Sequence, residues 1–204
     1  MTEHEIREIV ETQRKFFYTG AVLDVDYRIQ ALKKLQSCIL KYENEINDAI
    51  KKDLGKSAFE SYMCETGLVL SEISYMLKHI RKFSKEKTVL TPLAHFHSRS
   101  FKKPSPYGVV LIMSPWNYPF LLTIDPLVDA IAAGNTAVVK PSAYSPNTSE
   151  IMKKLIEECF DKEYVALVTG GRAENTCLLN EHFDYIFFTG SQTVGKEVMK
   201  CASS

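Results

Sequence analysis

The first part of the chain, up to about residue 85, carries apolar residues at helical spacing. Three runs of this kind cover residues 6–17, 29–50 and 63–80, and Gly55 follows the second run. Apolar positions that recur every three or four residues predict amphipathic helices, and a glycine after the last periodic position is typical of a helix end. We therefore expect residues 1–85 to form a helical scaffold.

Charged residues occupy the outer positions of these predicted helices. Two of them, Glu60 and Glu65, could be considered as an acid–base pair. Charged residues of an amphipathic helix usually lie on its solvated face, so we predict that both glutamates are exposed surface groups.

The pattern changes between residues 86 and 106. This segment contains three prolines, is rich in Ser and Thr, and alternates at residues 88–90 and 96–101. Such alternation favours extended chain and predicts an edge-strand arm or hairpin. His95 and His97 would share one face of a strand. A metal site needs further ligands, so we predict surface histidines and no metal site.

The remainder, residues 107–204, alternates short apolar runs with helical patterns. The predicted strands are residues 108–113, 136–140, 164–168 and 185–188, and the predicted helices are one that ends near residue 133 and those at residues 145–160, 176–180 and 190–199. This alternation indicates a parallel sheet with crossover helices, in which ligands bind at the carboxyl ends of the strands. The expected fold class is α/β, with an N-terminal helical segment and a Rossmann-like parallel sheet.

The start of the first crossover helix stays open. Pro126 lies inside its pattern. Either Asp125 caps a helix that begins at Pro126, or the helix begins near Phe120 and kinks at the proline.

Composition narrows the functional classes. The 204 residues are 45% hydrophobic and 25% charged, and 25 Lys and Arg balance 25 Asp and Glu. This balance gives no reason to expect a nucleic acid or an anionic membrane as partner. No apolar run has the length of a bilayer span, and the acidic N-terminus is unlike a signal peptide, so the expected location is cytoplasmic.

The cysteines argue against disulfide and zinc chemistry. Their number is odd, they are scattered, and no Cys-x-x-Cys occurs, which predicts mostly buried thiols. The five positions are Cys38, Cys64, Cys159, Cys177 and Cys201.

Candidate ligand-binding residues follow three of the predicted strands. Gly190 and Gly195 stand before the last helix, where glycine lets the backbone approach a phosphate, although Gln192 breaks the Gly-x-Gly-x-x-Gly pattern. Lys140 ends the second strand and could reach a ribose or a phosphate. Asn117 follows the first strand, and its amide could donate to an oxyanion.

Each of these signals alone also has an ordinary structural explanation. The glycines could form a plain tight turn, Lys140 could be a surface residue, and Asn117 a turn residue. Trp116 could wall a pocket or belong to the core. Their common place at the carboxyl ends of strands favours one shared ligand site.

Four segments together resemble a known family. Residues 114–120, Ser-Pro-Trp-Asn-Tyr-Pro-Phe, resemble the Pro-Trp-Asn-x-Pro signature of aldehyde dehydrogenases. Residues 132–142 are similar to that family's second-strand segment, and residues 188–195 to its nucleotide turn. Residues 53–57, Asp-Leu-Gly-Lys-Ser, and the glutamate and tyrosine after them resemble the class 3 branch, whose members oxidise medium-to-long aliphatic and aromatic aldehydes.

The resemblance implies NAD- or NADP-dependent oxidation of aldehydes to carboxylic acids. In the family, a cysteine thiolate attacks the aldehyde, the thiohemiacetal gives a hydride to NAD(P)⁺, and a glutamate-activated water releases the acid. By this resemblance Asn117 is the side-chain half of the oxyanion hole, and Lys140 binds the adenosine ribose. The implied cofactor-binding residues are Met113, Ser114, Pro115, Trp116, Lys140, Ser142, Gly190, Ser191, Gln192, Thr193, Val194 and Gly195.

Two features depart from the family pattern. Neither the Gly-Gln-x-Cys segment of the nucleophile nor the Glu-Leu-Gly-Gly-Lys segment of the base occurs, and Cys201 does not match the nucleophile's context. We therefore expect the 204-residue polypeptide alone to be inactive. Ala143 replaces a glutamate that often follows Lys-Pro-Ser. Since a carboxylate there would repel a 2′-phosphate, we expect NADP to be tolerated about as well as NAD.

Three functional interpretations follow. The first is an incomplete aldehyde-oxidising enzyme that forms a homodimer at full length, in which this chain supplies the scaffold and part of the NAD(P)-binding domain. The second is a catalytically inactive nucleotide-binding fragment or pseudoenzyme. The third is a reductase of acyl phosphates or acyl-CoA, which the motif at residues 116–119 makes less favoured. An incomplete sheet exposes apolar surface, so we expect poor solubility or self-association of the isolated chain.

Overall fold

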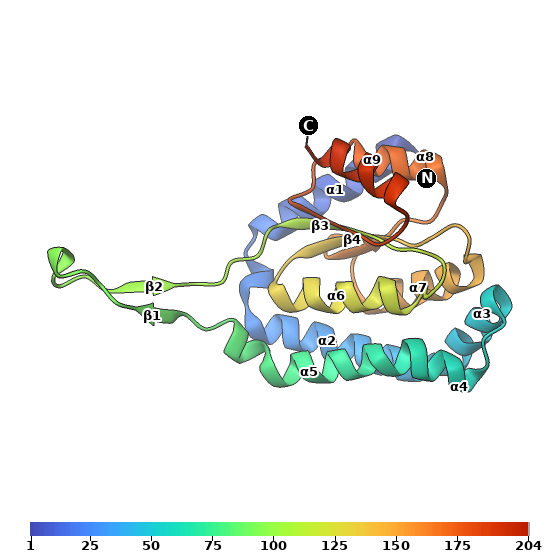
Figure 1. Ribbon diagram of the computed structural model, residues 1–204, viewed down its shortest axis with the longest axis horizontal. Helices are drawn as coiled ribbons and strands as arrows, with labels where there is room; N and C mark the ends of the chain where they lie inside the picture. Colours follow the sequence, from blue (N-terminus) through green and yellow to red (C-terminus); the bar gives the residue numbers. More distant parts are fainter. Residues whose placement is uncertain (204) are drawn as a thin grey trace.

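A four-stranded parallel sheet with helices on both faces forms the body of the molecule, and a narrow arm projects from one end of it (Figure 1). The computed structural model describes residues 1–203, so Ser204, the last residue of the predicted segment 107–204, lies outside the described residues. This architecture confirms the predicted α/β fold class.

The sheet has the strand order β5–β4–β3–β6, and all neighbouring strands are parallel. The strands are β3 (Val109–Met113), β4 (Thr136–Lys140), β5 (Val165–Leu167) and β6 (Tyr185–Phe188). All four predicted strands are confirmed to within one residue at each end. Every residue of β3 and β4 is buried, as expected for parallel strands that are covered on both faces.

Helices lie on the two faces of the sheet (Figure 1). One face is covered by α6 (Leu121–Ala133) and α7 (Pro146–Cys159), with α2 (Val25–Lys41), α3 (Glu43–Leu54) and α5 (Gly67–Phe83) packed against them. The other face carries α1 (Glu3–Tyr18), α8 (Arg172–Leu179) and α9 (Gln192–Ala202). Helix α8 begins four residues before its predicted start. The short 3₁₀ turn Ala21–Leu23 links α1 to α2.

The central strand β3 contributes to the cores on both faces. Val110 and Ile112 belong to the larger apolar cluster, which includes residues of α2, α5, α6 and α7. Leu111 and Met113 belong to a second cluster, which includes Ile6 of α1. This division follows from the two-residue period of a strand. The N-terminal helical segment therefore shares both of its cores with the sheet.

The second predicted helix is in fact two helices. Tyr42 separates α2 from α3, with backbone angles of φ −100° and ψ 12°. Its hydroxyl donates to Glu158 of α7, and its ring contacts the ammonium groups of Lys41 and Lys154. The bend lets α3 pack along α7, which a hydrophobic period alone does not reveal. Gly55, with φ +72°, ends α3 as predicted.

The third predicted helix is also interrupted. It consists of α4 (Ala58–Ser61), a π-helical turn (Tyr62–Thr66) and α5. The extra residue of the π-helical turn shifts the helical faces, and Met63, the first residue of the predicted apolar run, is exposed. The prediction that Glu65 is an exposed surface group is wrong, because its side chain is fully buried. The same shift of the helical faces accounts for this burial. Glu60 is exposed, as predicted.

The arm contains the predicted edge hairpin. Its strands are β1 (Lys87–Val89) and β2 (Ser100–Lys102), which pair antiparallel. Figure 1 shows the arm leaving the body at the end where β3 begins. The tip is not a strand, because Leu93–His95 form a 3₁₀ turn and His97 has a positive φ of 75°. The two histidines are exposed, as predicted, but they do not share a strand face.

Helix α6 resolves the open question at its start. It begins at Leu121, and Pro126 lies inside it, so Asp125 does not cap it. The amides of Phe120 and Leu121 instead donate to the carboxylate of Glu65. The start near Phe120 is therefore confirmed, and its cap comes from a distant part of the chain.

The burial predicted for the cysteines holds for Cys38 and Cys159 only. Cys64, Cys177 and Cys201 are partly exposed, and Cys177 packs at the margin of the second apolar cluster. Within residues 1–203, no helix combines the length and apolarity that a bilayer span requires, and no three His, Cys, Asp or Glu side chains are grouped to hold a metal ion.

Candidate active site

The carboxyl edge of the sheet lies opposite the arm (Figure 1). The segments at this edge line a crevice. It has a volume of about 350 Å³ and is formed by the segments that follow β3, β4, β5 and β6. Strands β3 and β6 are neighbours, and the helices that follow them, α6 and α9, lie on opposite faces. The segments that follow β3 and β6 therefore run in opposite directions from the edge of the sheet. The crevice between them occupies the topological switch point at which doubly wound sheets bind ligands.

Most of the predicted cofactor-binding residues line this crevice. They are Met113, Ser114, Pro115, Trp116, Lys140, Ser142, Gly190, Ser191 and Val194. Gln192, Thr193 and Gly195, on the first turn of α9, and Asn117 are not among the lining residues in the described part of the chain. The fold thus brings together three of the sequence segments that the family resemblance had singled out.

The turn between β3 and α6 forms one wall. The amide of Ser114 donates to the carbonyl of Lys140 at 3.2 Å, which continues the β3–β4 pairing beyond the strands. The Thr123 hydroxyl donates to the Pro119 carbonyl and is also hydrogen-bonded to the Ser114 hydroxyl. Trp116 is half exposed and lines the crevice, so it is a pocket wall and not a core residue.

Asn117 stands next to this wall and is exposed. Its backbone carbonyl accepts a hydrogen bond from Lys56 Nζ at 3.0 Å. Its side-chain amide makes no hydrogen bond to another of residues 1–203. The two N–H groups of the amide are therefore free to donate to a bound molecule.

Lys140 is buried at the end of β4, so it is not a surface lysine. Its Nζ donates to the carbonyls of Pro141 at 2.9 Å and Gly170 at 2.8 Å, which ties β4 to the loop after β5. An ammonium group has three donors, so one remains for a ligand. Burial lowers the pKa of Lys140 to about 8, and the charge of Glu174 opposes this shift.

The turn between β6 and α9 requires glycine at one position. A Cβ atom at Gly190 would lie 2.6 Å from the ring of Phe188, so a larger residue would displace that ring. At Gly195 the corresponding distance is 3.4 Å. Ser191 caps α9 by accepting from the amide of Val194 at 3.4 Å. The backbone at Gly190 and the amino end of α9 together form a surface that favours an anion.

Sequence reasoning missed a group of residues that also line the crevice. They are Tyr144, Gly170, Gly171, Arg172 and Asn175, while the other lining residues, Pro141, Ala143, Phe188 and Thr189, lie in or next to segments that the sequence had indicated. The signal that could have revealed part of this group is the Gly-Gly pair after the third strand. Gly170 has φ +134°, and a Cβ atom there would lie 2.3 Å from the carboxyl carbon of Glu174. Glu174 in turn accepts from the Gly171 amide at 2.7 Å and closes the loop.

Comparison with known proteins decides the family. The model of the aldehyde dehydrogenase family matches residues 1–204. The chain belongs to the aldehyde dehydrogenase family. The predicted resemblance is therefore confirmed, and similar proteins show how much of the family's length the chain represents.

Curated relatives and a solved structure agree with this assignment. The 4,4′-diaponeurosporen-aldehyde dehydrogenase of Staphylococcus aureus is 45% identical over 93% of this chain and 41% of its own length. Aldehyde dehydrogenase family 3 member A2 of Pongo abelii is 39% identical over 98% of this chain and 41% of its own length. The substrate-bound structure of an aldehyde dehydrogenase from Staphylococcus aureus has a TM-score of 0.95 at 44% identity, over 97% of this chain and 43% of that one. The chain thus spans about two fifths of these aldehyde dehydrogenases.

We predict that Lys140 changes the pH dependence of stability. Its pKa is about 8 in the native state, against an ordinary value of 10.5 in the unfolded chain. Between these two pH values the unfolded state binds more protons, so this group makes the free energy of unfolding rise with pH. Urea unfolding of the wild type and of Lys140→Met between pH 8 and 10.5 measures the effect.

We expect the difference in the free energy of unfolding between the two proteins to change in favour of the wild type as the pH rises. Lys103→Met, at an exposed position of the arm, controls for the loss of a lysine elsewhere. A difference that stays constant across this pH range would contradict the lowered pKa.

Proposed function

We propose that the protein to which these 204 residues belong oxidises aldehydes to carboxylic acids with NAD or NADP. The chain would supply much of the cofactor-binding site and the side-chain amide of the oxyanion hole, Asn117. The observation that carries the proposal is the crevice at the switch point, whose wall at Trp116 directly precedes Asn117. Membership of the aldehyde dehydrogenase family supports the reaction class.

The crevice suits a dinucleotide in two respects. The backbone at Gly190 and the amino end of α9 offer amide donors to a pyrophosphate. The remaining donor of Lys140 lies where a ribose hydroxyl would accept it. A bound NAD(P)⁺ supplies the hydride acceptor of the reaction.

Asn117 contributes to the reaction through its amide. The carbonyl oxygen of an aldehyde becomes negatively charged when a nucleophile attacks its carbon. Because the Asn117 amide has no other protein partner in the described structure, it can donate to this oxygen without first breaking a hydrogen bond. A donor that is already in place stabilises the developing charge better than water, which must reorient.

The test is NAD(P)H formation by the native-length protein from a panel of aliphatic and aromatic aldehydes. We expect Asn117→Ala to lower kcat by about 10²- to 10³-fold, the usual loss when one oxyanion donor is removed. Nucleotide affinity should stay within about twofold, since this amide does not contact the cofactor in the proposal. Asn180→Ala, at the exposed end of α8, is the matched control.

Wild-type kcat in Asn117→Ala would contradict the role of this residue. A native-length protein that oxidises no aldehyde would refute the proposed function. We expect the 204-residue polypeptide alone to give no turnover, because it contains neither of the family's nucleophile and base segments. Nucleotide binding by that polypeptide without turnover would favour the second candidate, a binding module.

We further propose that the site accepts NADP about as well as NAD. Ala143 and Arg172 both line the crevice. Alanine brings no carboxylate that would repel a 2′-phosphate, and a nearby arginine is a cation that can bind one. Ala143→Glu should therefore weaken NADP binding at least about tenfold more than NAD binding, a difference of about 1.4 kcal/mol.

Calorimetric titrations of the native-length protein with both nucleotides test this specificity. Ala173→Glu places the same charge at an exposed position outside the crevice and should affect both nucleotides equally. A strong preference of the wild type for NAD would contradict the proposal.

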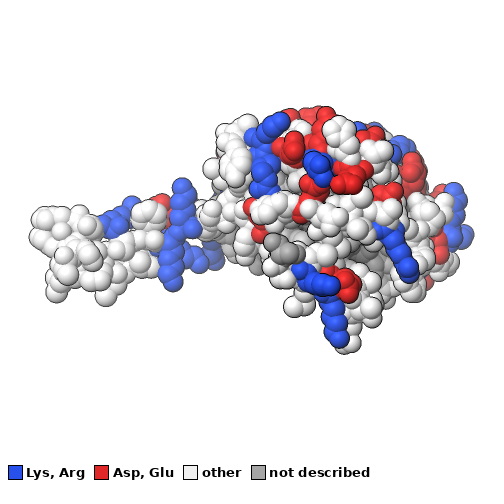
Figure 2. Space-filling model, turned by 90° about the horizontal axis from the view of Figure 1, so that it is seen from above, with Lys and Arg blue, Asp and Glu red and all other residues white. Residues whose placement is uncertain are grey.

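We also propose that the full-length protein is a homodimer held together through the arm. The tip carries apolar side chains that are almost fully exposed, with Leu90 at 95% and Leu93 at 89%, and Phe96 is largely exposed as well. Figure 2 shows the tip, without Lys, Arg, Asp or Glu, standing away from the body, with Lys and Arg along the stalk. Exposed apolar groups at the end of a projection are typical of a contact surface, and a second copy is the simplest partner.

Light scattering coupled to size-exclusion chromatography tests the arm. The triple variant L90S/L93S/F96S should elute as a monomer where the wild type elutes as a dimer, because its tip no longer gains from burial. Leu40→Ser, at an exposed apolar position on the body, should leave the dimer intact. A triple variant that remains dimeric would exclude the tip as the contact.

A further inference from the structure

A buried ion pair joins the N-terminal helices to the turn that carries Asn117. Lys56 Nζ lies 2.7 Å from Glu65 Oε1, and the two side chains are 11% and 0% exposed. Within residues 1–203, every other ion pair has more exposed partners. This pair is therefore the one place in the described structure where two opposite charges are taken almost completely out of water.

Glu65 uses its second oxygen to cap α6. Oε2 accepts from the amide of Phe120 at 2.8 Å and from that of Leu121 at 3.3 Å. These amides open the helix, where backbone donors lack helical partners and the helix dipole favours a negative charge. The cap that α6 lacks in its own sequence thus comes from the π-helical turn between α4 and α5.

Lys56 holds the other end of the same turn. Besides Glu65, its Nζ donates to the backbone carbonyl of Asn117 at 3.0 Å. The same atom lies 4.0 Å from the centre of the Tyr118 ring. One ion pair therefore contacts the backbone at residue 117 and at residues 120 and 121.

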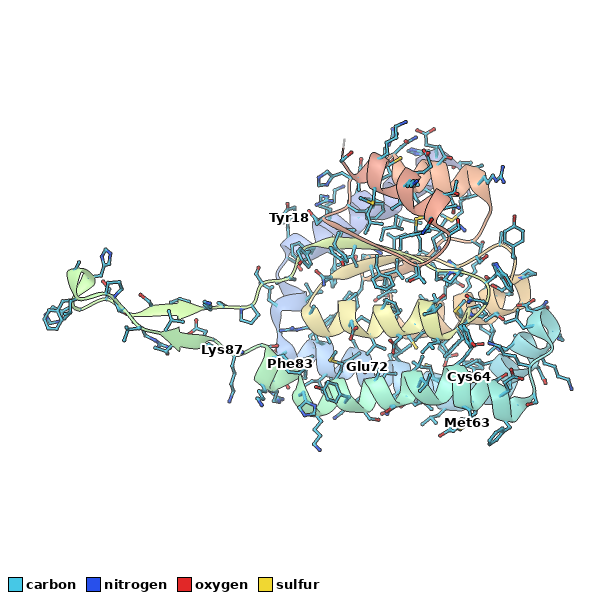
Figure 3. The ribbon with its side chains drawn as sticks, viewed as in Figure 1. Tyr18, Met63, Cys64, Glu72, Phe83 and Lys87 are labelled. Atoms are coloured by element: carbon cyan, nitrogen blue, oxygen red, sulfur yellow. The ribbon has the colours of Figure 1, made fainter. Side chains whose placement is uncertain are left out.

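A contribution to the stability of the fold does not by itself explain why two charges are buried here. Removing two charges from water is costly, and apolar residues of similar volume often stabilise a protein as well or better. The glutamate also depends on a π-helical turn, an irregularity found frequently at functional sites. In Figure 3 the labelled Met63 and Cys64 mark this turn, at the end of α5 away from the arm, while Phe83 marks the end from which the arm leaves.

We propose that Lys56 and Glu65 are positioning residues for Asn117. The pair fixes the backbone on both sides of this turn, so that the exposed amide keeps one direction beside the crevice. The catalytic meaning of the inference rests on the proposed oxidation of aldehydes. Its structural part rests on the contacts alone, which allows the two to be tested separately.

Hydrogen–deuterium exchange of the native-length protein tests the structural part. Glu65→Gln keeps the shape of the side chain and removes its charge, and Lys56→Met keeps the stem and removes the donors. In both variants the amides of residues 117, 118 and 120–122 should exchange at least about tenfold faster than in the wild type. Should Glu65→Gln fail to fold, the double variant K56M/E65Q removes both charges and should show the same increase.

Asp53→Asn is the matched control. Asp53 caps α7 as Glu65 caps α6, accepting from the amides of Asn147 at 3.2 Å and Thr148 at 2.7 Å, and within residues 1–203 its side chain makes no hydrogen bond to the Asn117 turn. This variant should speed exchange at the start of α7 and leave residues 117–122 unchanged. Equal changes at residues 117–122 in all variants, or none in Glu65→Gln and Lys56→Met, would overturn the proposal.

Steady-state kinetics test the catalytic part. Glu65→Gln and Lys56→Met should lower kcat about tenfold or more with KM within about twofold, since a misdirected donor weakens the transition state more than substrate binding. Asp53→Asn should keep the wild-type kcat. An equal loss in all three variants would overturn the catalytic part. If the native-length protein oxidises no aldehyde, the proposed function fails, and the exchange data still decide whether the pair fixes the turn.

Discussion

The need to cover both faces of the parallel sheet is the constraint on which the rest of the structure depends. Strand β3 is buried along its whole length, so it must have apolar partners on each side. Helices α6 and α7 cover one face, and α1, from the start of the chain, covers much of the other. Gln13 of α1 is fully buried and donates to the carbonyls of Ala137 and Lys162. The N-terminal helices are therefore part of the sheet's core and not an appendage to it.

The same constraint creates the crevice. Because α6 and α9 must cover opposite faces, the chain segments after β3 and β6 separate at the carboxyl edge. The carboxyl ends of parallel strands all lie at that edge. Trp116, Lys140 and Gly190 therefore line one crevice although they are far apart in the sequence. Lys140 then links two of the loops through its hydrogen bonds to backbone carbonyls. The site is thus a consequence of the topology, and its side chains add chemistry to it.

Sequence reasoning succeeded where the signal is local and regular, and it failed where a distant partner or one inserted residue decides the structure. The strands were predicted to within a residue because each is a short apolar run that a buried parallel strand requires. The bend at Tyr42 and the burial of Glu65 were missed, since one follows from a contact with α7 and the other from a single extra residue in a helix. In the site, the residues at the ends of β3, β4 and β6 were found. Most of the β5 loop was not, because Arg172 and Asn175 belong to no recognisable pattern.

Asn117 shows why the distant partners matter most for function. Its amide makes no protein hydrogen bond within the described residues, so no neighbouring side chain sets its direction. Its orientation must then come from the backbone, and the backbone of this turn is held by Lys56 and Glu65. A side-chain partner on the amide itself would occupy the donors that an oxyanion needs. Fixing the main chain on either side, at the cost of burying two charges, leaves those donors free and still gives them one direction.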